Sequence, residues 1–380
     1  MRKTGLYLFL ICSFFSCDNI ASQNDTIFLK KIEINPQEAT PKFLEDLAEE
    51  TVFTPLTPPF GLKIKKIDRV FFADSLIFIL DKSLDAVLIF GKDGKMLNKI
   101  PAKGKGQGKF TQITDVFFDK IEKKVEVYDG AISKIVIYDF QGKFIEEKNI
   151  NSPEKSGAMF YKFNNNYFFE RITVIKADKG RLSVFSNNNP SYKKSFLEIP
   201  NSISNVAYGV NFNAAIFRDS LFYIPLLDNK IYSVSANDAK PVYELILPEK
   251  YLVPEKLVNG PAMEDYNEFL GIMSNQGAVY GFSHLFMNEN YIAGSYKEGY
   301  QPWSLKFIYS KRTGKTLNYT KLKSHVVPSL NVSGSVIGNN GDYFIINIHH
   351  LQYENLPVNT SKFKLKGNSI ILMQIKFKEF

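Results

Sequence analysis

A repeat of about forty-five residues constrains this chain more than any other feature of its sequence. The segment IDRVFFADSLIFILDKSLDAVLIFGKDGKMLNKI (67–100) aligns with ITDVFFDKIEKKVEVYDGAISKIVIYDFQGKFIEEKNI (113–150). Each copy starts with an apolar strand that ends in VFF, and each second strand ends in an aspartate, Asp81 or Asp129. A third strand, a tight turn (GKDG or DFQG) and a fourth strand follow. Short strands joined by turns rich in Gly and Asp predict hairpins in series.

Four antiparallel strands per repeat, at a period of about forty to fifty residues, are the pattern of a β-propeller blade. The pattern continues more weakly down the rest of the chain. Three further sets of four apolar strands, and a last set of three, lie at 158–199, 213–247, 280–322 and 334–377. Hydrophobic residues make up 44% of the chain, enough for the core of such a fold. The sequence therefore predicts an all-β fold, a six-bladed β-propeller of four-stranded antiparallel blades.

The sixth blade lacks one strand, and a propeller removes its exposed edges when an N-terminal strand completes that blade. Two segments could do this, 27–34 (IFLKKIEI) and 50–57 (ETVFTPLT). Fourteen residues separate Phe53 from Ile67, close to the thirteen between the end of one repeat and the start of the next. This spacing favours 50–57 as the closing strand and leaves 27–34 as an added edge strand or arm. Residues 27–380 are then expected to form a single domain.

The first residues have the pattern of a bacterial signal peptide. Two cationic residues precede a ten-residue apolar run (6–15), which is too short to span a bilayer. Ser16 then precedes Cys17, an arrangement that resembles a lipobox, in which a diacylglycerol is attached to the cysteine after cleavage. We expect 1–16 to be the signal peptide, Cys17 to be lipidated and 17–26 to be a polar tether. A plain secretory signal with an incidental cysteine is the alternative.

Composition narrows the classes of site and partner. Cys12 and Cys17 are the only cysteines, so we expect no disulfide, cysteine nucleophile or cysteine metal ligand in the folded part. The formal net charge is +8, but the lysines are scattered through strands and turns. Because nucleic-acid-binding proteins usually concentrate basic residues on one element, the sequence predicts no nucleic-acid partner. It predicts a membrane contact through the lipid anchor.

Two segments resemble a known family. GKGQGKFTQITDVFF (104–118) is similar to the start of an NHL-type repeat. FLEDLAEETVFTPLTPPFGLKIKKIDRVFFADSLIFILD (43–81) resembles the opening of the six-bladed, TolB-like β-propeller lipoproteins of Bacteroidetes. The resemblance is clear over 43–150 and implies a propeller anchored in the cell envelope, as an outer-membrane lipoprotein. It implies no catalytic residues, because that family has no common established activity.

The glycines of 104–108 raise the question of a phosphate-binding loop. A P-loop requires Ser or Thr after its Gly-Lys pair and a helix next, whereas here Phe110 follows and a strand comes next. We interpret the segment as a connection between blades, with Phe110 filling the space between them.

Candidate binding segments fall on one face of the predicted ring. In a propeller, the connections between blades share a face with the loops between second and third strands. Two insertions fall there, and long excursions from a compact scaffold are often functional. The first insertion is 248–277, and we expect its helical part at about 254–275. Its apolar spacing predicts a helix over 261–274. The second insertion is the polar loop 351–368. The alternative for the helix is that it only covers the channel mouth.

The same face is predicted to carry eight candidate ligand-binding residues: Lys103, Lys105, Lys109, Arg181, Tyr300, Trp303, His349 and His350. A Tyr–Trp pair near cations suits sugars or anionic polymers, through stacking and charge. The alternative for Trp303 is a core position between blades, because large aromatic residues occupy cores as often as pockets.

Catalytic chemistry has little support in the sequence. His349 and His350 are adjacent in a strand and would point to opposite faces, and neither HExxH nor GxSxG occurs. Some NHL-related propellers are lyases or Ca²⁺-dependent esterases with histidine or acidic residues around the channel, so the resemblance allows such a site here. Four aspartates could converge there: Asp81, Asp115, Asp119 and Asp129. The alternative is that these aspartates cap turns at the ends of strands.

These observations favour a non-catalytic envelope lipoprotein that binds or scaffolds a partner protein or an envelope glycan. We predict no catalytic residue, no metal site and no cofactor. A hydrolase or lyase at the channel mouth is the alternative, and a purely structural interaction protein is a third possibility. Clustered carboxylates or histidines within coordination reach would favour the enzyme, whereas an aromatic-lined groove without such a cluster would favour binding.

Overall fold

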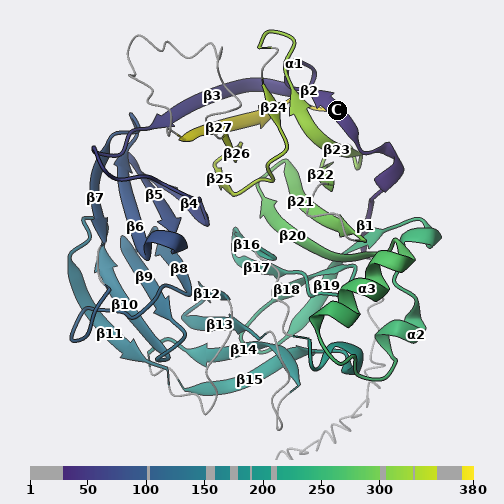
Figure 1. The fold of residues 1–380 in the computed structure, drawn as a ribbon, viewed down its shortest axis with the longest axis horizontal. Helices are drawn as coiled ribbons and strands as arrows, with labels where there is room; N and C mark the ends of the chain where they lie inside the picture. The colour runs from purple at the N-terminus through teal and green to yellow at the C-terminus, as the bar shows by residue number, and fades with distance from the viewer. Residues whose placement is uncertain are drawn as a thin grey trace, which may run out of the picture.

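The structure is a computed structural model that describes residues 29–100, 103–150, 159–171, 179–188, 191–206, 212–299, 305–327, 330–348 and 370–380. The described residues form six sheets arranged in a ring around a common axis, as Figure 1 shows. Each sheet contains four antiparallel strands, and three short strands are added at outer edges. The predicted all-β, six-bladed propeller is confirmed.

The first three blades follow the chain from the innermost to the outermost strand. Blade one contains β4 (Arg69–Ala73), β5 (Leu76–Asp81), β6 (Ala86–Gly91) and β7 (Met96–Ile100). Blade two contains β8 (Asp115–Asp119), β9 (Lys124–Asp129), β10 (Lys134–Asp139) and β11 (Phe144–Asn149). Blade three contains β12 (Met159–Phe163), β13 (Asn166–Glu170), β14 (Gly180–Ser186) and β15 (Tyr192–Glu198).

The last three blades have the same order, except that the outermost strand of blade six comes from the N-terminal part of the chain. Blade four contains β16 (Ala214–Phe217), β17 (Ser220–Tyr223), β18 (Lys230–Val234) and β19 (Ala239–Ile246). Blade five contains β20 (Val279–Met287), β21 (Tyr291–Glu298), β22 (Leu305–Ser310) and β23 (Thr316–Lys323). Blade six contains β25 (Gly338–Asn340), β26 (Tyr343–Ile348), β27 (Ile370–Phe377) and β3 (Ala48–Leu56).

The core lies between neighbouring blades, because each sheet packs its two faces against the sheets beside it. The middle strands β6 and β10 are therefore almost entirely buried runs of β-branched and aromatic residues. Phe110 is fully buried among Phe78 and Phe140, between blades one and two. This confirms the predicted role of the glycine-rich segment as an inter-blade connection.

The glycine that ends the turn between the third and fourth strands, in both GKDG and DFQG, is required for steric reasons. Gly94, the last residue of the GKDG turn, has a φ of 78°, which side chains rarely adopt. A Cβ atom there would lie 1.9 Å from the carbonyl oxygen of Pro55 in β3. The turn of blade one therefore packs directly on the strand that closes blade six.

Residues 30–56, which we call the N-terminal belt, run along the outer edges of three blades (Figure 1). They contain β1 (Lys30–Glu33), the 3₁₀ helix η1 (Pro36–Glu38), β2 (Thr40–Phe43), α1 (Leu44–Leu47) and β3. β1 is parallel to β19, β2 is parallel to β23, and β3 is antiparallel to β27. The short β24 (Asn331–Val332) also pairs with β23. Closure by 50–57, with 27–34 supplying an added edge strand, is confirmed.

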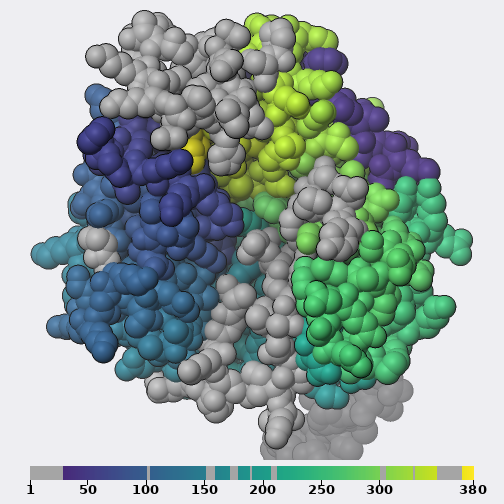
Figure 2. Space-filling view, in the orientation of Figure 1, coloured from purple at the N-terminus to yellow at the C-terminus, as the bar shows by residue number. Residues whose placement is uncertain are grey.

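The insertion after blade four contains η4 (Glu249–Tyr251), α2 (Glu255–Val258) and α3 (Tyr266–Gln276). α3 starts later than predicted because the Asp265 carboxylate accepts the amide hydrogens of Asn267 (2.8 Å) and Glu268 (3.0 Å). It ends at Gly277, where φ is 60°. Figure 2 shows the insertion, in green, on this face of the molecule, to the right of its centre.

The apolar stripe of α3 is used for packing. Phe269 and Met273 are fully buried against Ile203 and Tyr280, beside the short 3₁₀ helix η3 (Asn201–Ile203). The 3₁₀ helix η2 (Lys82–Leu84) joins β5 to β6 on the same side of the ring. Within the described ranges, no helix combines the length and the apolarity needed to cross a bilayer.

Candidate functional site

The innermost strands of the six blades face the common axis of the ring (Figure 1). Two cavities open along it, and both are bordered by Arg69, Phe212 and Ile337, which we call the waist. The loop-side chamber, of about 370 Å³, also contacts Lys66, Lys82 and His284. The hairpin-side chamber is larger, about 640 Å³, and is bordered by the turns between the first and second strands of the blades. Both volumes are in the range of small-ligand pockets.

A buried ion pair holds the waist together. The Arg69 guanidinium donates from Nε and Nη2 to the two Asp115 carboxylate oxygens, each at 2.6 Å. Asp115 also accepts the backbone amide hydrogen of Phe160 at 3.0 Å, so β4, β8 and β12 meet at this carboxylate. The guanidinium carbon lies 5.0 Å from the ring centre of Phe212 and 5.5 Å from that of Tyr161. Burial opposes the charge on Arg69, but the Asp115 carboxylate outweighs it and raises the pKa of Arg69.

A second buried polar group lies between blades three and four. Glu170 is fully buried and accepts hydrogen bonds from Asn213 (2.7 Å) and the Tyr223 hydroxyl (2.8 Å) on its Oε1. Burial raises the pKa of Glu170, although the nearby Arg181 guanidinium opposes the shift. Glu170 Oε2 and Arg181 Nε make no hydrogen bond within the part of the chain that the structure describes.

The predicted ligand-binding residues that are described do not border either chamber. Lys103, Lys105 and Lys109 are exposed on one inter-blade connection, and Lys103 Nζ pairs with Asp85 Oδ2 at 2.6 Å. Arg181 is buried in β14, with 1% of its surface exposed, because it faces Glu170 inside the propeller. The other four candidates, and with them Cys17 and the loop 351–368, lie outside the described residues: Tyr300, Trp303, His349 and His350.

The four aspartates divide into two pairs. Asp81 accepts the amide hydrogens of Lys65 (2.8 Å) and Ser83 (2.9 Å), and Asp129 accepts those of Thr111 (2.6 Å) and Ala131 (3.1 Å). These two cap turns, as the alternative interpretation holds, and so does Asp119, which accepts the amide hydrogens of Ile121 (3.1 Å) and Glu122 (2.9 Å). The other pair lies at the channel, where a cationic side chain neutralises each carboxylate: Arg69 for Asp115 and Lys162 for Asp119. No group of three or more His, Cys, Asp or Glu in the described ranges is arranged to hold a metal ion.

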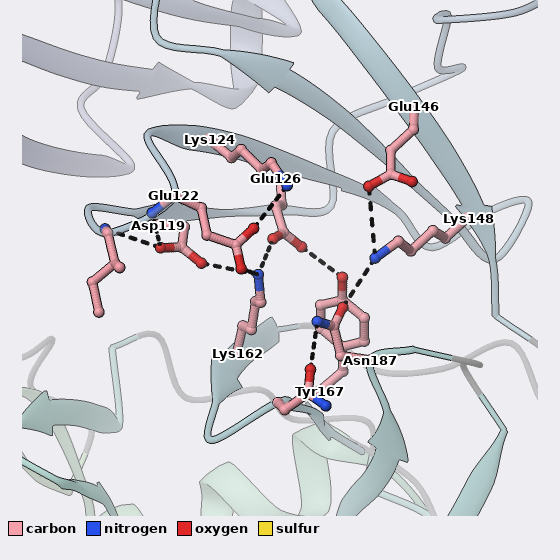
Figure 3. A network of polar contacts seen from close by, with 11 residues as sticks. Asp119, Glu122, Lys124, Glu126, Glu146, Lys148, Lys162, Tyr167 and Asn187 are labelled. Atoms are coloured by element: carbon pink, nitrogen blue, oxygen red, sulfur yellow. Dashed lines mark hydrogen bonds and ion pairs between the residues drawn. The ribbon is translucent and has the colours of Figure 1, made fainter.

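Figure 3 shows the network around Lys162, which joins blades two and three at the rim of the hairpin-side chamber. Lys162 Nζ lies 2.7 Å from Glu126 Oε1, 2.9 Å from Asp119 Oδ2 and 3.9 Å from Glu122 Oε1. The Tyr167 hydroxyl donates to the other Glu126 oxygen at 2.7 Å. Burial opposes the charge on Lys162, but Glu126 outweighs it and raises the pKa of Lys162. Lys162 thus occupies the centre of this group of carboxylates.

The wall of the hairpin-side chamber is largely aromatic and aliphatic. Its apolar side chains include Phe71, Phe117, Phe163, Ile216 and Phe286. At the rim, Ile121 has 95% of its surface exposed although it is a large apolar residue. Lys120 Nζ lies 4.9 Å from the ring centre of Phe71, where its charge faces the ring. This chamber therefore offers apolar contact area, and its rim carries amides and charges.

The loop-side chamber is more polar. Its border has three cationic side chains, Lys66, Arg69 and Lys82, and two carboxylates, Asp68 and Asp115. His284 lies in a bulge of β20 with a φ of 51°, and its Nδ1 is 2.6 Å from the Ser283 hydroxyl oxygen. Burial, together with the charges of Lys306 and Lys66, lowers the pKa of His284 to about 3. Sequence analysis did not select His284, because the bulge that turns it into the channel has no marked signal in the strand sequence VYGFSHLFM (279–287).

The ring of six blades and its two axial chambers define the class of this protein: a six-bladed β-propeller with ligand-sized cavities on its axis. The sequence profile described as "Domain of unknown function (DUF4934)" matches residues 31–370, and the chain belongs to this family. No curated protein matches the chain.

Two solved structures from Bacteroides are similar in fold. One is a Bacteroides fragilis protein whose description suggests export, with a TM-score of 0.70 and 17% identity over 92% of this chain and 100% of that one. The other is a member of the DUF4221 family from Bacteroides vulgatus, with a TM-score of 0.56 and 11% identity over 88% of this chain and 98% of that one. At these identities the likeness shows the fold alone.

Proposed function

We propose that this protein is an exported, lipid-anchored binding module of the cell envelope, which holds a segment of a partner protein in its hairpin-side chamber. The observation that carries the proposal is the apolar wall and rim of that chamber, with Ile121 exposed at 95% and phenylalanine side chains from several blades. Exposed apolar side chains gathered around a cavity are typical of surfaces that a partner covers. The volume of about 640 Å³ suits a short chain segment better than a whole domain.

The state of the charged groups supports binding over catalysis. Asp119 and Glu126 are paired with Lys162, and Arg218 at the rim is paired with Glu289. A general acid or base needs a pKa near the working pH and access to the substrate. Burial opposes the charge on Asp119, but hydrogen bonds from the Glu122 backbone and from Lys162 lower the pKa of this carboxylate, which suits it to fix the shape of a wall.

Export and anchoring rest on the sequence and agree with the fold class. The apolar run 6–15 and Cys17 support a cleaved signal and a lipid anchor, and the described fold contains no cysteine. The resemblance of 43–81 to the TolB-like propeller lipoproteins of Bacteroidetes supports an outer-membrane location. A glycan in place of a protein segment is the competing ligand class, since aromatic walls also bind sugars.

Two probe sets test the proposed ligand class on residues 18–380: a phage-displayed library of random peptides and an immobilised panel of bacterial glycans. We expect peptides with apolar side chains to be enriched. Ile121→Asp should weaken their binding about tenfold or more, because burying an exposed Ile contributes about 1.5–3 kcal/mol.

Ile132 provides the matched control. It is also an exposed isoleucine of blade two, at 48%, but it lies in the turn between β9 and β10 on the other side of the ring. Ile132→Asp should leave peptide binding unchanged. Enrichment of glycans alone, or equal binding by the Ile121→Asp and wild-type proteins, would contradict the proposal.

A further inference from the structure

The loop-side chamber is bordered by one cationic side chain, Lys82, that takes no part in the ion pairs around the waist. Lys66 Nζ pairs with Asp68 at 2.8 Å, and Arg69 pairs with Asp115. Lys82, in η2, borders the same cavity and is only partly exposed, yet its ammonium group has no ion pair or hydrogen bond among the described residues. A half-buried charge without a partner is unfavourable unless something else binds it.

The surroundings of Lys82 add to the positive charge of the chamber. Burial lowers the pKa of Lys82, and the charges of Arg69 and Lys66 lower it further, although Asp115 and Asp68 oppose the shift. On the blade-five wall of the same cavity, His284 stays neutral at pH 7 because burial and the charges of Lys306 and Lys66 lower its pKa to about 3. The chamber is therefore an environment in which an added negative charge is stabilised and an added positive charge is not.

Other groups on the wall complement an anion. The Ser335 hydroxyl accepts a hydrogen bond from the Ser295 hydroxyl at 2.7 Å, which leaves its own proton free to be donated into the cavity. Met159, Phe212 and Ile337 give the same cavity an apolar side. A volume of about 370 Å³ fits a small molecule and not a polymer.

We propose that the loop-side chamber binds a small organic anion, whose carboxylate or phosphate oxygens pair with the Lys82 ammonium and accept from the Ser335 hydroxyl. The carbon skeleton of the anion lies against Met159, Phe212 and Ile337. This site is separate from the protein-binding surface of the hairpin-side chamber and does not depend on it. The waist lies between the two sites, and there Arg69 is already paired with Asp115.

Calorimetry and thermal unfolding of residues 18–380 test the site with named probes. The anionic probes are inorganic phosphate, acetate and hexanoate, and hexanamide is the neutral counterpart of hexanoate. Hexanoate should bind and raise the melting temperature, because it supplies both the charge and the apolar chain. Hexanamide should not. Tighter binding of phosphate than of either carboxylate would assign the head group as a phosphate.

Lys82→Met and Lys92→Met are the matched variants. Lys92 is an exposed lysine in the turn after β6 of the same blade, so both variants lose one positive charge. Lys82→Met should weaken hexanoate binding about tenfold or more, and Lys92→Met should leave it unchanged. Without ligand, Lys82→Met should melt at the same temperature as the wild type or higher, since it removes an unpaired buried charge. Equal binding by both variants, or equal binding of hexanamide, would overturn the proposal.

Discussion

At the waist of the channel, Arg69 and Asp115 show how a few polar side chains can fix the positions of whole blades. The two side chains come from β4 and β8, and Asp115 also accepts the amide hydrogen of Phe160 in β12. Buried ion pairs contribute little net stability compared with apolar residues of similar volume, but loss of one partner leaves an uncompensated charge. We therefore infer that this pair fixes the relative positions of the inner strands β4, β8 and β12.

The first prediction concerns this pair. Asp115→Asn keeps an acceptor for Phe160 but leaves the Arg69 guanidinium without its counter-charge, so we expect a loss of about 3 kcal/mol in the free energy of unfolding. Urea denaturation would measure it. The double variant Arg69→Met/Asp115→Asn should recover most of the loss, because it removes the unpaired charge. Equal stability of Asp115→Asn and the wild type would show that the pair is not needed.

The second prediction concerns His284, whose pKa in the folded state is lowered from 6.5 to about 3. As the pH falls below about 6.5, the unfolded chain gains a proton on this residue, whereas the folded protein stays neutral there until about pH 3. The contribution of His284 is therefore fully present above pH 6.5 and is lost as the pH falls towards 3. The expected slope is about 1.4 kcal/mol per pH unit.

His284→Asn isolates this contribution, because asparagine is neutral and tolerates the positive φ of 51° at this position. Urea denaturation of both proteins between about pH 6 and pH 4 should show a steeper loss for the wild type. Parallel losses in the two proteins would mean that His284 is protonated in the folded state.

At the scale of single elements, β1 and β3 differ in what depends on them. β1 adds a parallel strand to the outer edge of blade four and buries Ile32, whereas β3 completes blade six along its full length. A chain that starts at residue 37 should remain folded and lose about 3–6 kcal/mol, from the burial of Ile32 and Ile34. A chain that starts at residue 58 should not close its ring. Circular dichroism and thermal unfolding would distinguish the two, and equal melting temperatures would contradict this ranking.

Much of the element order could be predicted because blades one and two repeat almost position by position. Hairpins give local signals, namely alternating apolar residues and turns with Gly or Asp, so even the weaker blades were found. The sequence gives no such signal for the pairings of β1 and β2. Each is a short parallel edge strand whose partner lies far along the chain, so no turn connects the two. The start of α3 was predicted too early because apolar spacing alone does not show that Asp265 caps the helix.

At the scale of the whole molecule, the candidate sites depend on ring closure. Lys82, Asp115, His284 and Ser335 lie in four different blades or their connections, and no sequence spacing links them. Sequence analysis placed candidates on long loops, whereas the chambers are bordered mainly by inner strands and short turns. A residue of an inner strand has the same local pattern as any half-buried strand residue, so only the closed ring distinguishes it.

If Cys17 carries the proposed lipid, the N-terminal belt limits how far the propeller can lie from the membrane. Thirteen residues separate Cys17 from Lys30, where β1 begins, so a lipid on Cys17 would hold blade four within about 45 Å of the bilayer. A protein with one acyl chain binds a membrane reversibly, whereas a protein that carries two or more chains, as a diacylglycerol does, stays anchored. Cys17→Ala should therefore leave the membrane fraction and lose labelling by a radioactive fatty acid, whereas Cys12→Ala should keep both. Membrane retention of unlabelled Cys17→Ala protein would place the attachment in the propeller itself.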